Sequence, residues 1–187
     1  FIIMPRAMVS VKRICEVLDT ESTIKDGTFT ASPAGSPVGT VEFNNVSFKY
    51  PDASEYVLHD VSFKAEKGQT VAFIGSTGSG KSTAINLVPR FYDATEGEVL
   101  VDGVNVKDYT LRALHDKIGY VPQRAVMFSG TVESNVAYGE KDGTEYTLDD
   151  VKEAVRVAQG TDFIEKKEDT YSAHVAQGGT NFSGGQK

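Results

Sequence analysis

A glycine-rich segment of eight residues between two apolar stretches constrains the fold of this chain most strongly. Gly75–Ser82 reads Gly-Ser-Thr-Gly-Ser-Gly-Lys-Ser and fits the pattern G-x-x-x-x-G-K-[ST]. It follows an apolar run over 70–74, which predicts a strand buried on both faces of a sheet, and precedes a predicted helix over 80–88. A glycine-serine linker would neither lie between a core strand and a helix nor need a lysine at its end. A strand, a tight loop and a helix in this order predict an α/β fold.

The residue types in this segment suit the binding of phosphate groups. Backbone N–H groups that turn inward at the start of a helix attract concentrated negative charge, and glycines let the backbone approach closely. Lys81 would bring a mobile positive charge to the β- and γ-phosphates, and the Ser82 hydroxyl suits Mg²⁺. The pattern therefore predicts a nucleoside triphosphate site with these residues: Gly75, Ser76, Thr77, Gly78, Ser79, Gly80, Lys81, Ser82 and Thr83.

The rest of the chain predicts a mixture of strands and helices. Alternation of apolar and polar residues predicts half-buried, antiparallel strands over 41–43, 46–50 and 61–65. A hairpin with an Asp102-Gly103 turn is predicted over 98–106, a short helix over 111–117 and a second buried strand over 118–121. Thr147 followed by Asp150 resembles a capping box, so we expect a helix there that Gly160 ends.

The first forty residues differ in composition from the remainder. Apolar residues three and four apart predict an amphipathic helix from Pro5 to Leu18, with proline in its first turn. Residues 20–40 are rich in Ser, Thr, Gly and Pro, which is typical of a linker. The apolar run Phe1–Met4 is too short to span a bilayer, which takes about 20 apolar residues. We therefore place a domain boundary between residues 20 and 40.

Charge and cysteine content narrow the class of protein. The 19 basic and 26 acidic residues give a net charge of −7, which argues against a general nucleic-acid footprint. Ten acidic and five basic residues lie in 140–169, and we interpret this stretch as a solvated helical face. A single cysteine, Cys15, and no recognisable signal peptide favour a reducing, cytosolic setting.

Three further segments carry a resemblance to a known family. Asn181–Lys187 resembles the signature motif LSGGQ of ATP-binding-cassette (ABC) proteins, with Phe182 where Leu is usual. Tyr120–Gln123 is similar to the strand that leads into their Q-loop, which places Gln123 at the Q-loop position. Met127–Gly139 resembles the segment LFSGTIxxNIxYG of exporter-type cassettes, and Arg13–Asp19 resembles the exporter segment that enters the nucleotide-binding domain.

The resemblance implies an α/β fold: a P-loop NTPase (RecA-like) core with an antiparallel β subdomain and a helical subdomain. Residues 1–19 would be the end of a transmembrane domain and a connecting helix, 20–40 a linker, and 41–187 an incomplete cassette with its helical subdomain at about 124–187. Its location would be the cell membrane, with the cassette on the cytoplasmic side. The transported compound stays open among drugs, lipids and peptides.

The resemblance also implies roles for particular residues and partners. Tyr50 would stack on adenine, Val57 would contact ATP, and Lys81 and Gln123 would be catalytic, with Ser82 and Gln123 binding Mg²⁺. Four signature residues would contact ATP held by a second cassette in a head-to-tail dimer: Ser183, Gly184, Gly185 and Gln186. The implied partners are a second cassette and the chain's own transmembrane domain, and a nucleic-acid partner is not expected. The implied cofactors are ATP and Mg²⁺.

In this family the Walker B strand, the catalytic glutamate and the switch histidine follow the signature motif. The sequence ends with the signature segment at Lys187, before the positions of these elements. His59, His115 and His174 all precede the signature, so we expect surface or packing roles for them. On this basis the sequence predicts a fragment lacking the C-terminal part of the core, with an unpaired sheet edge, that binds ATP better than it hydrolyses it.

Three functions are compatible with the sequence. The first is the ATPase domain of an exporter, and the second is a catalytically degenerate ATP-binding half of a heterodimeric exporter. The third, a P-loop protein that works without membranes, is disfavoured by the exporter-like segment Met127–Gly139 and by the helix ahead of the linker.

Overall fold

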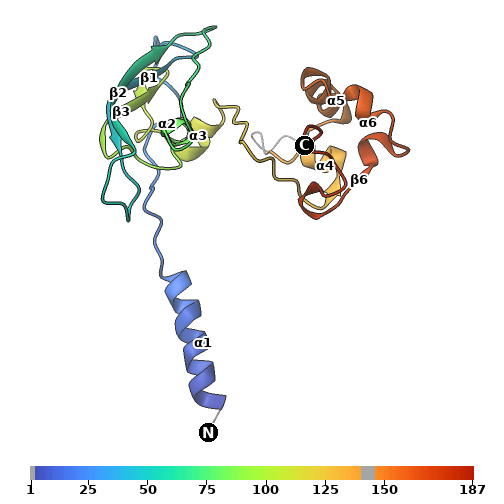
Figure 1. The fold of residues 1–187 in the computed structure, drawn as a ribbon, viewed down its shortest axis with the longest axis horizontal. Coiled ribbons are helices and arrows are strands. Elements are labelled where there is room, and N and C mark those ends of the chain that lie inside the picture. The colour runs from blue at the N-terminus through green and yellow to red at the C-terminus, as the bar shows by residue number, and fades with distance from the viewer. Residues whose placement is uncertain (1–2, 140–145) are drawn as a thin grey trace. The chain divides into compact units, whose positions relative to one another are not determined.

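The computed structural model describes residues 3–139 and 146–187, which form two compact units, Phe1–Gly119 and Tyr120–Lys187 (Figure 1). The first two residues of the apolar run at the start of the chain lie outside the described residues. The same holds for 140–145, the first part of the acidic stretch.

Helix α1, Ile3–Leu18, confirms the helix predicted from residue 5 onward. Its apolar stripe is exposed at Met8, Val11, Ile14 and Leu18. No helix in the described ranges is both long and apolar enough to cross a membrane.

A four-stranded antiparallel sheet forms the centre of the first unit, in the order β2-β1-β3-β4. Its strands are β1 (Val41–Phe48), β2 (Leu58–Ala65), β3 (Glu96–Val101) and β4 (Val104–Asn105). The pattern predicted two short strands over 41–50, and the structure has one strand with an irregular register between Phe43 and Val46. The antiparallel arrangement predicted from the alternation is confirmed.

The predicted hairpin turn between β3 and β4 is present. Asp102 and Gly103 have φ angles of 52° and 74°, both in the left-handed region. A two-residue hairpin loop with this backbone matches the twist of its strands, and Asp and Gly tolerate it best. The Asp-Gly pair thus fixes the register of this hairpin.

One hydrophobic core joins the sheet to two short helices, α2 (Lys81–Leu87) and α3 (Leu111–His115). Both helices were predicted. Gly80 precedes α2 and Thr110 caps α3 by accepting a hydrogen bond from the Ala113 N–H. The most deeply buried core side chains are Phe43, Val46, Leu87, Val99, Tyr109 and Leu114.

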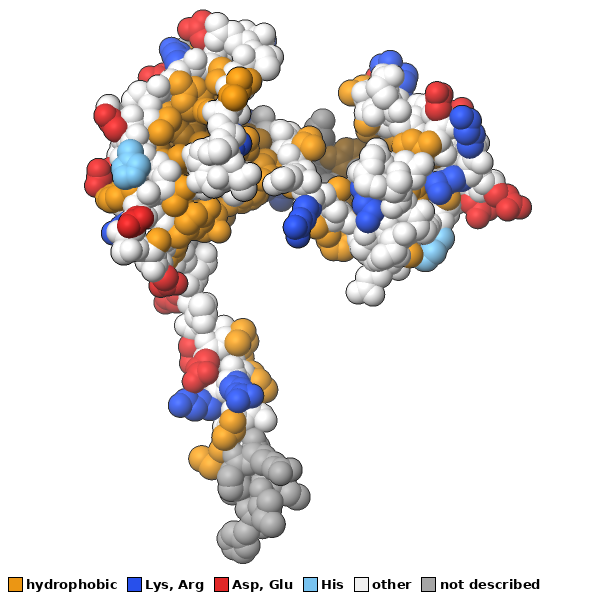
Figure 2. All heavy atoms as spheres, viewed as in Figure 1, with side chains coloured by type: hydrophobic (Ala, Val, Ile, Leu, Met, Phe, Trp, Pro, Cys, Tyr) orange, Lys and Arg blue, Asp and Glu red, His pale blue; other side chains and the backbone are white. Residues whose placement is uncertain are grey.

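Two predicted strands are not formed. Residues 70–74 and 118–121 have no regular secondary structure, and Val71, Ile74 and Val121 are exposed. A parallel strand needs neighbouring strands to accept and donate its backbone hydrogen bonds and to cover its side chains. No strand among the described residues pairs with either run, so apolar side chains remain on the surface of the first unit (Figure 2).

The second unit is mainly helical. In this unit β5 (Gly130–Thr131) pairs with β6 (His174–Val175) as a short antiparallel ladder. Its helices are α4 (Val132–Val136), α5 (Leu148–Val157) and α6 (Thr161–Ile164), with 3₁₀ turns η1 (Thr170–Ser172) and η2 (Gln177–Gly179). The predicted capping box of Thr147 and Asp150 starts α5, and Thr131 with Ser134 starts α4 in the same way. Their buried faces meet in a second core with Tyr171, Val175 and Phe182.

Asp102 provides a test of the hairpin's attachment to the chain before β1. Its buried carboxylate accepts hydrogen bonds from the Gly39 N–H at 2.6 Å, the Thr40 N–H at 3.2 Å and Lys117 Nζ at 3.0 Å. Burial by itself raises the pKa of Asp102, but the hydrogen bonds and the charge of Lys117 outweigh it, so the pKa lies below its usual 3.8.

We expect Asp102→Asn to lower the free energy of unfolding at pH 7 by about 1 kcal/mol, because asparagine has no charge to pair with Lys117. Asparagine tolerates the positive φ of this position, so the backbone need not change. The native carboxylate stabilises the fold above its unfolded-state pKa, and this advantage disappears as the pH falls through the lower folded-state pKa. Urea unfolding at pH 7 and pH 3 measures both effects; an equal difference at the two pH values would contradict the assignment.

Candidate functional site

The predicted phosphate loop lies between the sheet and α2. Gly75–Ser79 has no regular secondary structure and leads through Gly80 into α2. Gly78 and Gly80 have φ angles of 86° and 87°, which L-residues with side chains rarely adopt. A Cβ atom at Gly80 would lie 2.8 Å from Leu58 Cδ2 and 3.1 Å from the Val57 carbonyl oxygen. The loop is therefore held against the start of β2 by a contact that only glycine permits.

The ammonium group of Lys81 holds the loop together. Lys81 Nζ donates hydrogen bonds to the Gly75 carbonyl oxygen at 2.9 Å, the Ser76 carbonyl oxygen at 2.6 Å and Ser79 Oγ at 3.1 Å. These three acceptors are neutral, whereas a phosphate oxygen carries negative charge and attracts the ammonium more strongly. A phosphate group could thus exchange with the loop oxygens for the same ammonium.

Tyr50, which follows β1, contacts the helix that continues the loop. The Tyr50 hydroxyl and Thr83 Oγ1 share a hydrogen bond of 3.0 Å, and Thr83 is buried in α2. The Tyr50 ring meets Phe48 and Tyr92 edge to face, with centroid distances of 5.0 and 5.2 Å. Sequence reasoning did not point to Tyr92, which carries no motif and reaches this cluster only through the fold. Tyr50 therefore reaches the buried face of α2, and its edge-to-face contacts fix the orientation of its ring.

The structure brings the proposed ATP-binding residues of the first unit into one region. Val57 and Gly80 touch, Lys81 closes the loop, and Tyr50 bonds to Thr83. Ser82 is exposed at the start of α2. Gln123 and the signature residues belong to the second unit, where Gln123 is exposed and outside any helix or strand.

The described residues around the loop could coordinate Mg²⁺ only together with phosphate oxygens. Within 3–139 and 146–187, no three His, Cys, Asp or Glu side chains are grouped so that they could hold a metal ion. Mg²⁺ prefers oxygen ligands, keeps several waters and is commonly bound through one or two protein groups and substrate phosphates. The exposed Ser82 hydroxyl is chemically suited to be one such ligand.

The signature segment forms a tight turn in the second unit. The Ser183 carbonyl oxygen accepts hydrogen bonds from the Gln186 and Lys187 N–H groups at 3.0 and 3.2 Å. The Ser183 N–H in turn donates to Gln186 Oε1 at 3.1 Å. Phe182, at the position where leucine is usual, is buried in the second core, with Lys167 Nζ 4.2 Å from its ring centroid. The hydrophobic role of the position is thus preserved by a larger side chain.

The two glycines of this segment are not required by the packing of the chain itself. A Cβ atom at Gly184 or at Gly185 would meet nothing within 4 Å, and neither residue has a positive φ angle. Ser183–Gln186 is also exposed. Side chains are thus absent at a surface that the rest of the chain leaves open, which suits the close approach of another molecule.

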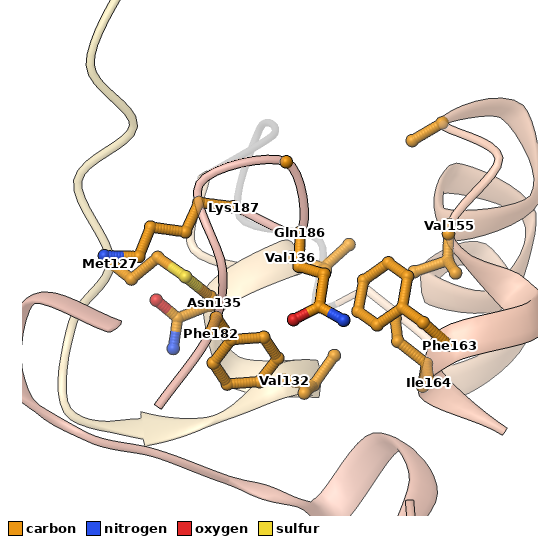
Figure 3. A pocket seen from close by; sticks show the side chains of 13 residues that line it. Met127, Val132, Asn135, Val136, Val155, Phe163, Ile164, Phe182, Gln186 and Lys187 are labelled. Carbon is orange, nitrogen blue, oxygen red and sulfur yellow. The ribbon is translucent and has the colours of Figure 1, made fainter. Parts of the chain in front are cut away.

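A pocket of about 210 Å³ lies behind the signature segment, between α4, α5 and α6 (Figure 3). Phe182 and Gln186 form one wall, and Val155, Phe163 and Ile164 lie opposite. Most of the lining is apolar, and it belongs to the second core rather than to the phosphate loop.

Comparisons with known proteins agree on one family. The family described as "ABC transporter" matches residues 58–187. An uncharacterized ABC transporter ATP-binding protein of Mycobacterium tuberculosis H37Rv is 44% identical over 185 residues, covering 99% of this chain and 31% of the relative. The ATP-dependent lipid A-core flippase of Haemophilus influenzae Rd is 39% identical, covering 96% of this chain and 30% of the flippase. A putative multidrug export ATP-binding/permease protein of Bacillus subtilis 168 is 40% identical, covering 98% of this chain and 31% of that protein.

A solved structure shares the fold. The structure of a bacterial Atm1-family ABC exporter with ATP bound matches with a TM-score of 0.82 and 34% sequence identity, covering 98% of this chain and 31% of that one. The chain thus spans about a third of the length of the proteins it matches.

Alanine substitutions should affect stability differently at the loop glycines, Gly78 and Gly80, and at the signature glycine Gly184. Gly80→Ala introduces both an unfavourable φ and a clash with Leu58, so we expect a loss of about 2 kcal/mol in the free energy of unfolding. Gly78→Ala adds only the unfavourable φ, so its loss should be smaller, about 1 kcal/mol. Gly184→Ala should change the free energy of unfolding by less than about 0.5 kcal/mol. Urea unfolding measures all three; equal losses at Gly80 and Gly184 would refute the described loop geometry.

Proposed function

Because this chain belongs to the ABC transporter family, we propose that it binds MgATP through its phosphate loop within an exporter that couples ATP binding and hydrolysis to export across a membrane. The observation that carries the proposal is the loop itself. Lys81 is held by three loop oxygens beside a buried Thr83, and Tyr50 reaches the same helix.

Each residue of the site has a chemical role in the proposal. Lys81 neutralises charge on the β- and γ-phosphates, and the backbone of Gly75–Thr83 surrounds them. Ser82 and Gln123 contribute oxygen ligands to Mg²⁺, and Gln123 orients the attacking water. Tyr50 stacks on the adenine, and Val57 contacts the nucleotide. The fixed geometry of the glycine loop supports this arrangement, because binding then needs little ordering of the backbone.

The signature residues act on a second ATP in this proposal. Ser183, Gly185 and Gln186 contact the γ-phosphate of ATP held by another cassette, with Gly184 allowing close approach, so that two cassettes meet head to tail with ATP between them. The open space at both glycines supports this, since the chain's own packing gives no reason for their small size. ATP thereby joins the two cassettes, and its hydrolysis lets them separate.

The domain boundaries follow from the same proposal. Residues 1–19 connect to a transmembrane domain, 20–40 link it to the cassette, and 41–187 belong to the cassette. Residues 124–187 form its helical subdomain, which is supported by the compact unit that starts at Tyr120. The cassette then works on the cytoplasmic side of the cell membrane. The names of the flippase and of the multidrug permease support lipids and drugs as classes of exported compound.

An alternative proposal is a catalytically degenerate half of a heterodimeric exporter. It agrees equally with the geometry of the phosphate loop, because loss of hydrolysis does not require loss of ATP binding. The residue after the Walker B aspartate of the gene product decides between the two: Glu for an active site, Asp or Gln for a degenerate one.

Lys81→Ala should weaken MgATP binding by at least about tenfold, because a charge-assisted contact to phosphate is lost. Isothermal titration of the wild type and the variant with MgATP measures this. Lys166→Ala removes an equal charge from an exposed position in the second unit and serves as the control. Equal affinities of the wild type and Lys81→Ala would overturn the site assignment.

Gly185→Ala should leave the fold and the binding of MgATP unchanged but reduce ATP-dependent association of cassettes by at least about tenfold. The added methyl group meets nothing in its own chain, so it can interfere only with a molecule outside it. Sedimentation of the cassette with and without ATP measures association. Unimpaired ATP-dependent dimers of the variant would contradict the role of the signature segment.

A further inference from the structure

Tyr92 lies in a short segment that follows α2 and returns to the sheet. Its ring meets Tyr50 with the centroids 5.2 Å apart and the ring planes at 89°. It also packs on Phe48, with a centroid distance of 5.6 Å and an interplanar angle of 54°. Phe48 and Tyr50 in turn meet at 5.0 Å and 82°. Each of the three rings therefore contacts the other two, so the orientation of one ring constrains that of its neighbours.

The start of this segment is clamped by a buried arginine. Arg90 Nε donates to Asp93 Oδ1 at 2.7 Å and its Nη2 donates to Asp93 Oδ2 at 3.3 Å, which makes a two-point ion pair. Arg90 is only 6% exposed, and its Nη1 donates to the Lys107 carbonyl oxygen at 3.2 Å. A bidentate pair between arginine and a carboxylate fixes the geometry of both side chains. The two residues on either side of Phe91 and Tyr92 in the chain are thereby held together.

The end of the segment is bonded to β1 and to the residue after it. The Thr95 N–H donates to the Ser47 carbonyl oxygen at 3.0 Å, and the Lys49 N–H donates to Thr95 Oγ1 at 3.1 Å. Ser47 belongs to β1, and Lys49 immediately precedes Tyr50. Residues 90–95 are therefore fixed at both ends, with Tyr92 between them.

The ring plane of Tyr50 depends on these neighbours. The hydrogen bond between its hydroxyl and Thr83 Oγ1 holds the end of the side chain at 3.0 Å. The phenol oxygen lies on the axis about which the ring turns, so this bond leaves the rotation of the ring free, and the torsion itself has only a broad preference. Contacts with Phe48 and Tyr92 restrict that rotation. Tyr50 is half-buried, so part of its side chain stays open to a base.

We propose that Tyr92 is a positioning residue for the nucleotide base, because it holds the Tyr50 ring in the plane that stacks on adenine. The inference rests on the proposed function, in which Tyr50 stacks on the base while Lys81 and the glycine loop bind the phosphates. A ring that is held before binding loses little freedom when a base stacks on it, whereas a loose ring has to be ordered. The contribution of Tyr92 therefore belongs to the affinity for the base and not to the affinity for the phosphate chain.

The experiment compares two probes of the same site in the full-length protein that contains this chain. MgATP reports on the base and the phosphates together, whereas magnesium tripolyphosphate has no base and reports on the phosphate loop alone. Isothermal titration gives the Kd for MgATP, and competition with MgATP gives the Kd for tripolyphosphate. Tyr92→Ala should weaken MgATP binding about fivefold and leave the Kd for tripolyphosphate within about twofold of the wild type.

Matched variants separate positioning from general damage. Tyr92→Phe keeps the ring and should bind MgATP as the wild type does. Tyr92→Leu fills much of the same space without a flat ring and should reproduce the selective loss, so it tests the proposal even where Tyr92→Ala fails to fold. Phe91→Ala removes the neighbouring ring, which is exposed and meets the His115 ring at 6.3 Å, and should leave both affinities unchanged.

The outcomes distinguish failure of this inference from failure of the proposed function. A wild-type protein that does not bind MgATP refutes the proposed function. If the wild type binds MgATP and both Tyr92→Ala and Tyr92→Leu match its affinity, only the role of Tyr92 is refuted. Equal losses for MgATP and tripolyphosphate in these variants would show that Tyr92 supports the whole site rather than the base. A loss in Tyr92→Phe as large as that in Tyr92→Ala would refute the ring contact as the cause.

Discussion

The hydrogen bonds of β1 to both of its neighbours determine where the phosphate loop lies. β1 pairs with β2 on one side and with β3 on the other, and its buried side chains Phe43, Val46 and Phe48 support the first core. This pairing brings the start of β2 against Gly80 and places Tyr50, just after β1, beside Thr83. The site is therefore built on a sheet whose register is set by alternating side chains, and the loop adds the glycines that this close packing requires.

Elements whose signals are local could be predicted from the sequence. The Asp102-Gly103 turn, the capping box of Thr147 and Asp150, and the start of α2 after Gly80 each depend on a few neighbouring residues. The same is true of the glycine-rich loop ahead of α2, because the glycines with positive φ and the lysine that bonds to the loop lie within eight residues. Such signals need no knowledge of what the rest of the chain does.

Features that depend on distant contacts could not be predicted. The apolar run over 70–74 has the composition of a buried strand, but a strand forms only where another strand accepts its hydrogen bonds, and Ile74 is exposed. Residues 20–40 have the composition of a linker, yet Asp26 binds the first residue of α3 and Gly27 binds Tyr109, through contacts that span more than 80 positions of sequence. The bond between Tyr50 and Thr83 is invisible to any local pattern for the same reason.

The central claim, that ATP binds between Tyr50 and the phosphate loop, is tested most directly by photolabelling. An azide at C8 of the adenine becomes reactive on illumination and attaches to whatever the base touches. The account predicts that 8-azido-ATP with Mg²⁺ labels the peptide that contains Tyr50, and that excess ATP prevents the labelling. Labelling confined to peptides that include neither Tyr50 nor Val57, with ATP still competing, would contradict it.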